Sequence, residues 1–162
     1  MNFYTEDEIS IDKFPDFDKF HPKRRVAIAV DGSESAIKSL KYAIENVFRK
    51  DDAIFVLNAV KTSNFEAFKS EEEAKGLKIQ NTEKAAFAVK KSLELLKDFD
   101  KKHGLVLTGK DEREILLNAL ETLEPNFFVV GSRGLGAVKR VVLGSVSSYL
   151  VHHTKCPIIV VK

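Results

Sequence analysis

The chain has 162 residues, of which 44% are hydrophobic and 31% charged, with a formal net charge of +2. These values are typical of one globular domain. No apolar run approaches the roughly 20 residues of a membrane span, and the near-neutral charge, the acidic N-terminus and the lack of an aromatic–basic motif argue against nucleic-acid binding. The acidic N-terminus does not resemble a secretory signal and the one cysteine, Cys156, cannot form an internal disulfide, so we expect a cytoplasmic protein without a membrane partner.

Five short apolar runs alternate with helical patterns along the chain. The predicted strands are 25–30, 53–60, 105–108, 127–130 and 158–161. The predicted helices cover 34–48, a stretch near 81–102, the segment around Leu116–Leu123 and a stretch near 145–154. Most of the strand runs are continuously apolar, as in parallel strands that are covered on both faces. The sequence therefore predicts an α/β fold, a three-layer open sandwich with a five-stranded parallel sheet and helices on both faces.

Two segments lie outside this alternation. Residues 1–22 carry aromatic side chains among six acidic residues. We expect an N-terminal extension there, which is either a flexible arm or a strap that packs on the domain or on a partner. Residues 61–80 form a long polar connection, and such connections in a compact domain are usually functional or mobile. Residues 23–162 would form the domain itself.

The stretch from Val129 to Ser148 carries two glycine steps between a strand and a helix. The segment Gly131–Gly134 follows the fourth predicted strand, and Gly144 opens the last predicted helix. Glycine has no Cβ to block the approach of a ligand to the backbone. A helix N-terminus has free N–H groups and a partial positive charge. The hydroxyls of Ser145 and Ser147 can add hydrogen bonds.

The charge distribution also favours an anionic ligand at this loop. No acidic residue follows Glu124, whereas Arg133, Lys139 and Arg140 lie inside the loop. The pattern predicts a phosphate-binding loop. The alternative is a glycine turn and a serine cap that hold no ligand.

Asp31 is a second candidate, because it ends the first predicted strand directly before a Gly-Ser pair. Its carboxylate can accept hydrogen bonds from a ribose hydroxyl or from an adenine amino group. Asp-Gly is also a common turn pair, so a purely structural role is equally consistent with the sequence.

Other motifs fail. The segment Gly104–Asp111 fits part of a P-loop, but Asp111 stands where the magnesium-binding Ser or Thr is needed. The residues between its two glycines also form a predicted strand rather than a loop. We find no nucleophile–base pair and no Cys/His cluster with the spacing of metal ligands.

Beyond the loop, the chain resembles the universal stress protein family. The spacing Gly131-x2-Gly134-x9-Gly144-Ser145 matches that family's ATP-binding signature, G-x2-G-x9-G-(S/T), at every position. The segment VAIAVDGSESA at 26–36 resembles the family's first strand and turn, and residues 144–162 resemble its closing helix and strand. The resemblance covers residues 24–162. It implies the strand order 3-2-1-4-5, ATP bound at the carboxyl edge of the sheet, and often a homodimer.

The same resemblance implies a role for individual residues. Asp31 would meet the adenosine, and Ala59 would contact the adenine through its backbone. Asn58-Ala59 departs from the His-Val of many relatives. The residues that would surround the ribose and the phosphates are Gly131, Ser132, Arg133, Gly134, Gly144, Ser145, Val146 and Ser147.

The favoured function is an ATP-binding regulatory protein of the stress response, in which nucleotide biases the conformation or the dimer. The loop is complete, yet no catalytic base accompanies it. AMP and ADP are alternative ligands, and Mg²⁺ can accompany ATP. Two other functions stay open, a slow ATPase and a dimeric protein-interaction module in which nucleotide is incidental. We expect no catalytic residue and no resident metal.

Overall fold

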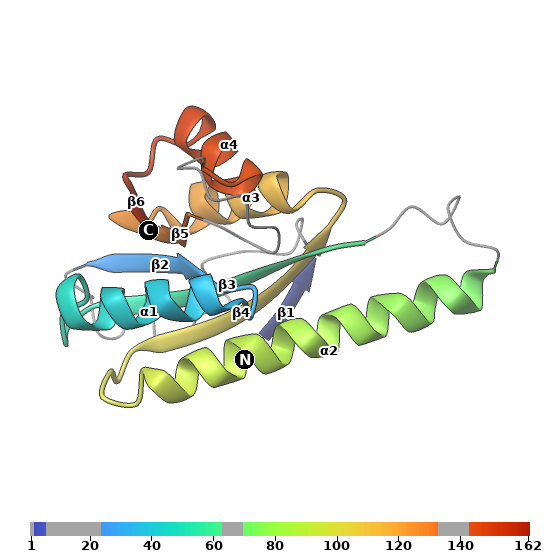
Figure 1. Ribbon diagram of the computed structural model, residues 1–162, viewed down its shortest axis with the longest axis horizontal. Coiled ribbons are helices and arrows are strands. Elements are labelled where there is room, and N and C mark those ends of the chain that lie inside the picture. The colour runs from blue at the N-terminus through green and yellow to red at the C-terminus, as the bar shows by residue number, and fades with distance from the viewer. Residues whose placement is uncertain (1, 6–23, 63–69, 133–142) are drawn as a thin grey trace.

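A parallel β-sheet forms the middle layer of the protein (Figure 1). The structure is a computed structural model and describes residues 2–5, 24–62, 70–132 and 143–162. The spatial order of the strands is β1-β4-β3-β2-β5-β6. The strands are β1 (Asn2–Thr5), β2 (Arg25–Ala29), β3 (Ala53–Lys61), β4 (Lys102–Gly109), β5 (Phe127–Gly131) and β6 (Ile158–Val161). The helices are α1 (Glu34–Asn46), α2 (Glu71–Leu95), α3 (Glu112–Leu123) and α4 (Ser145–His153).

The five predicted strands are confirmed, and β2 to β6 have the order 3-2-1-4-5 when they are numbered along the chain. The sheet is nevertheless one strand wider than predicted, because β1 pairs with β4. Asn2 lies opposite Leu105, and Thr5 lies opposite Thr108. A four-residue segment is too short to show a strand pattern, and its partner is distant in the sequence. Residues 6–22 of the predicted extension lie outside the described residues.

Helices cover both faces of the sheet, as predicted (Figure 1). Helices α1 and α2 lie on one face, and α3 and α4 lie on the other. In β2, Val26 and Ile28 pack with the α1 and α2 side, whereas Ala27 packs with the α3 and α4 side. Strands β2 to β6 therefore bury side chains on both faces, which explains their apolar runs.

Helix α2 corrects two expectations. It begins at Glu71 and ends at Leu95, whereas the sequence predicts a polar connection over 61–80 and a helix near 81–102. Residues 71–80 of the expected connection are therefore helical, Lys61 belongs to β3, and residues 63–69 lie outside the described residues. Ser70 caps it by accepting a hydrogen bond from the Glu73 N–H at 3.2 Å. Its first turns are mostly exposed and lack an apolar stripe, so periodicity alone could not reveal them. Neither α2 nor another helix in the described ranges has the length and apolar character that crossing a bilayer requires.

The order of the strands creates the position of the site. From β2 the chain adds β3 and then β4 on one side, and it later adds β5 and β6 on the other. Because all strands are parallel, their carboxyl ends lie at the same edge. A crevice is expected at this edge, between β2 and β5, where the connections diverge. The ends of these two strands, at Asp31 and Gly131, flank that point.

Candidate functional site

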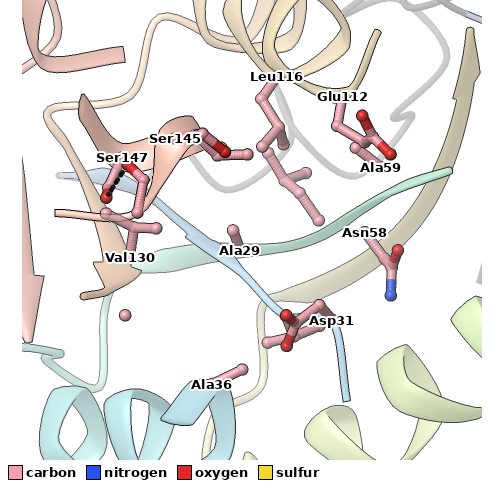
Figure 2. Close-up of a pocket in the computed structure, with 15 residues that line it drawn as sticks. Ala29, Asp31, Ala36, Asn58, Ala59, Glu112, Leu116, Val130, Ser145 and Ser147 are labelled. Carbon is pink, nitrogen blue, oxygen red and sulfur yellow. Dashed lines mark hydrogen bonds between the residues drawn. The ribbon is translucent and has the colours of Figure 1, made fainter. Parts of the chain in front are cut away.

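A cavity of about 370 Å³ opens at the carboxyl edge of the sheet, where the strand order predicts a crevice (Figure 2). This volume falls in the range of small-molecule sites, roughly 300–1,000 Å³. The walls come from the ends of β2, β3 and β5 and from the starts of α3 and α4. The lining residues are Ala29, Val30, Asp31, Ala36, Leu57, Asn58, Ala59, Glu112, Leu116, Val130, Gly131, Gly144, Ser145, Val146 and Ser147.

Most of the residues predicted from the sequence meet at this cavity. Seven of the ten line it, namely Asp31, Ala59, Gly131, Gly144, Ser145, Val146 and Ser147. Ser132 is buried next to Gly131 and contributes its backbone to the frame of the site. Arg133 and Gly134 lie outside the described residues. Segments from three separate strands and one helix are thus brought together.

The start of α4 differs from the starts of the other described helices. Ser33, Ser70 and Asp111 each cap a helix by accepting a hydrogen bond from a backbone N–H. Gly144 occupies the same position in α4 and supplies no side-chain hydrogen bond. The first intrahelical bond runs from the Ser148 N–H to the Gly144 carbonyl, at 2.9 Å. The three N–H groups before it open α4 at the cavity, where they can donate to an anion.

Two backbone hydrogen bonds hold the ends of the glycine loop together. The Ser132 N–H donates to the Val161 carbonyl at 2.8 Å, which ties the end of β5 to β6. The Gly144 N–H donates to the Ser132 carbonyl at 3.0 Å. The start of α4 is thereby fixed against the end of β5, although the loop separates them in the sequence.

The two serines at the start of α4 have different roles. The Ser147 hydroxyl donates to the Gly144 carbonyl at 3.0 Å, and Ser147 is 2% exposed. Its proton is therefore already used within the helix cap. The expectation that Ser147 contributes to ligand binding stays a prediction. Ser145 is exposed and lines the cavity, so its hydroxyl faces the space that a ligand would fill (Figure 2).

Asp31 combines the two roles that the sequence left open. Its Oδ1 accepts a hydrogen bond from the Ser33 N–H at 2.9 Å, so it does support the turn. The turn also needs Gly32, whose φ is +81°, a conformation that L side chains rarely adopt. Asp31 is nevertheless exposed and lines the cavity, and Oδ2 accepts no hydrogen bond within the described part of the chain. One carboxylate oxygen thus serves the fold while the other can serve a ligand.

Sequence reasoning missed the wall formed by β3 and α3. Leu57 and Leu116 make it apolar, and Glu112 adds a carboxylate. The only sequence signal was Asp111, the N-cap of α3, which marks Glu112 as the first residue of a helix that follows a strand. The rejection of a P-loop at Gly104–Asp111 was correct, because β4 extends to Gly109. Glu112 lies far from the glycine loop in the sequence and reaches the site only through the fold.

A second cavity, of about 610 Å³, lies between α1 and α2 and shares Val30, Asp31 and Ala36 with the first. Its outer wall includes Phe87, which is 63% exposed and lies under the Lys91 ammonium at 5.7 Å from the ring centre. The start of α1 beside it is already capped by Ser33. The carboxyl-edge cavity is therefore the better candidate for an anionic ligand.

Comparison with known proteins gives a consistent picture. The model of the "Universal stress protein family" matches residues 23–162. The universal stress protein PHOS32 of Arabidopsis thaliana is 32% identical over 158 residues, which cover 86% of this chain and 65% of PHOS32. The chain thus spans somewhat less than two thirds of this relative's length.

Solved structures agree on the fold. The protein MJ0577 superimposes with a TM-score of 0.74 at 24% identity, covering 87% of this chain and 96% of that one. A universal stress protein family protein from Arabidopsis thaliana superimposes with a TM-score of 0.63 at 23% identity, covering 86% and 91%. That structure has AMP bound.

Proposed function

The chain belongs to the universal stress protein family, and on that premise we propose that it is an ATP-binding regulatory protein of the stress response. The observation that carries the proposal is the uncapped start of α4, which opens into a cavity at the carboxyl edge. No side chain of the described residues caps the three backbone N–H groups there, so they can donate hydrogen bonds to a phosphate. Arg133, in the loop before α4, would add a cation.

The chemistry of the cavity orients the nucleotide. Phosphate groups belong at α4, because Asp31 and Glu112 would repel them elsewhere in the lining. The apolar side chains of Leu57 and Leu116 suit the base. Asp31 lies at the end of β2, the strand between these two regions, where its carboxylate can accept hydrogen bonds from ribose hydroxyls. AMP in a solved family member supports an adenine nucleotide.

We propose ATP as the ligand, with ADP and AMP as weaker alternatives because they present fewer phosphate oxygens to α4. Within the ranges that the structure describes, no group of three or more His, Cys, Asp or Glu side chains could hold a metal ion. Mg²⁺ would therefore enter with the nucleotide phosphates.

Titration calorimetry of the full chain with Mg-ATP tests this proposal. At a hundredfold excess over Kd, bound nucleotide should stabilise the fold by about 2.7 kcal/mol, visible as a higher Tm. The absence of both heat and thermal stabilisation at millimolar ATP would overturn it. Phosphate release by the purified protein, compared with a Gly144→Val control, separates a regulator from a slow ATPase.

We further propose a homodimer in which β6 pairs across a two-fold axis. β6 lies at the edge of the sheet, and Ile158, Ile159 and Val160 are only partly buried. An apolar edge strand presents unpaired backbone groups to a second copy. Native mass spectrometry of freshly purified protein would report the number of subunits and any retained nucleotide. A monomer at micromolar concentration contradicts the dimer and leaves nucleotide binding untouched.

A further inference from the structure

We propose that Glu112 reads the base, accepting a hydrogen bond from the C6 amino group of adenine and rejecting purines with a C6 oxygen. The inference rests on the proposed function, since it assigns the specificity of the same site. It goes beyond that function by naming a residue outside the glycine loop as the specificity determinant.

The position of Glu112 places it opposite the phosphate end. Glu112 begins α3, which follows β4, and α4 follows β5. In the sheet β4 and β5 lie on opposite sides of β2. Figure 2 accordingly shows Glu112 beside Ala59, away from Ser145 and Ser147. A nucleotide with its phosphates on α4 would direct its base toward Glu112.

Glu112 lies in the first turn of α3, where a negative charge favours the helix start, but this role does not require it to line the cavity. Asp111 caps α3, accepting from the Arg113 N–H at 2.9 Å, and it also pairs with the Arg113 side chain. Glu114 accepts a hydrogen bond from the Tyr149 hydroxyl. Glu112 stands between these two acids, and among the described residues its carboxylate has no hydrogen bond or ion pair. It alone of the three acids lines the cavity.

An ionised carboxylate only accepts hydrogen bonds, and this decides which base it tolerates. Adenine presents an amino group at C6, which donates. Hypoxanthine and guanine present an oxygen there, which would face the Glu112 carboxylate acceptor to acceptor when the base keeps the orientation of adenine. Their N1–H can donate to the carboxylate only if the base shifts in the cavity. Leu57 and Leu116 keep the surroundings apolar, so such a mismatch is poorly relieved by water. Sites built around a hydrogen bond discriminate strongly against analogues that cannot make it.

The test compares ATP with ITP, whose base, hypoxanthine, carries an oxygen at C6 and a proton at N1. We expect the wild-type protein to bind ATP at least about tenfold more tightly than ITP. In Glu112→Gln the side-chain amide can donate to the C6 oxygen, so the ratio of the two Kd values should fall by about tenfold. Glu121→Gln is the matched control, because Glu121 is exposed on the same helix and does not line the cavity. Its ratio should equal that of the wild type.

The outcomes separate this inference from the function on which it rests. If the wild-type protein binds neither nucleotide, both are overturned. If it binds ATP but does not discriminate against ITP, or if Glu112→Gln keeps the wild-type ratio, the role of Glu112 is overturned and nucleotide binding stands. Thermal unfolding of Glu112→Gln should stay close to the wild type, because among the described residues the carboxylate has no hydrogen bond or ion pair to lose and only its interaction with the start of α3 changes.

Discussion

The two glycine steps of the loop lie at opposite ends of one motif, yet the structure needs them for different reasons. A Cβ on Gly131 would lie 2.9 Å from the Ser39 Oγ and 3.0 Å from the Ser35 Oγ. A Cβ on Gly144 would lie 3.6 Å from the Ser132 carbonyl oxygen and 3.7 Å from the Ser147 Oγ, which are ordinary contacts. Gly144 also has a φ of −60°, which any residue adopts. Gly131 is thus needed for packing, whereas the fold alone does not need Gly144.

The glycine motif thus combines a structural requirement, at Gly131, with a functional requirement, at Gly144. Gly131 lets the end of β5 pass close to α1, and so sets the position of the cavity wall. Gly144 keeps the space above the free N–H groups of α4 clear of side-chain atoms. Gly131→Ala should therefore mainly lower the stability of the fold, and Gly144→Ala should mainly lower the affinity for nucleotide.

Gly131→Ala should have the largest effect, lowering the free energy of unfolding by about 2 kcal/mol, as expected for overpacking. The Ser39 Oγ cannot move away freely, because Ser39 is 1% exposed and donates to the Ser35 carbonyl at 2.8 Å. Urea denaturation measures the change. Adding Ser39→Ala removes the closest atom, so the double variant should recover part of the loss. Wild-type stability in Gly131→Ala would contradict the packing role.

Gly144→Ala should reverse this profile. We expect a free energy of unfolding within about 1 kcal/mol of the wild type, since the added methyl meets no close neighbour. The affinity for Mg-ATP should fall about tenfold, equivalent to about 1.4 kcal/mol, because the methyl crowds the phosphate end of the cavity. Calorimetry and denaturation on the same preparations test both halves. Unchanged affinity would mean that Gly144 is not in contact with the nucleotide.

The two serines at the start of α4 should also differ, one affecting affinity and the other stability, with smaller effects than the glycines. Ser145→Ala should weaken ATP binding by roughly fivefold, the loss of about one hydrogen bond, and leave stability unchanged. Ser147→Ala should lower stability by about 1 kcal/mol, because it removes the bond to the Gly144 carbonyl, and change affinity less. The pair is measured by titration and by thermal unfolding. Equal effects on affinity would show that both hydroxyls contact the ligand.

The contrast between local and distant information also explains what the sequence could predict. Gly131, Gly144 and Ser145 were found because a strand, a turn and a helix start are visible in neighbouring residues. Glu112 and Leu57 were missed, because nothing local distinguishes them from an ordinary helix start and an ordinary core strand. Only the strand order brings them to the cavity.

The same limit applies to the elements themselves. The apolar core strands were predicted correctly, since burial on both faces leaves a continuous apolar run. The first turns of α2 carry no apolar stripe, and only the Ser70 cap and the glutamates that follow it mark their start. β1 depends on pairing with a strand far along the chain, which no local pattern records.

The capped start of α3 provides the last test, since it is the counterpart of the uncapped start of α4. Hydrogen bonds from the Arg113 side chain and backbone N–H lower the pKa of Asp111 from 3.8 to about 2. The folded state thus favours the ionised carboxylate. Its stabilising effect is complete above the usual pKa, near pH 4, and is lost as the pH falls toward 2.

Asp111→Asn should therefore be less stable than the wild type at neutral pH, by a smaller margin than Gly131→Ala or Ser147→Ala, because the pair is at the surface. The difference between the two proteins should shrink between pH 4 and pH 2. Denaturation at several pH values measures it, with Glu121→Gln as a matched surface control. A difference that persists unchanged at pH 2 would mean that the ionised cap does not stabilise α3. At the start of α3 the Asp111 carboxylate accepts from a backbone N–H of the first turn, whereas no side chain does so at the start of α4.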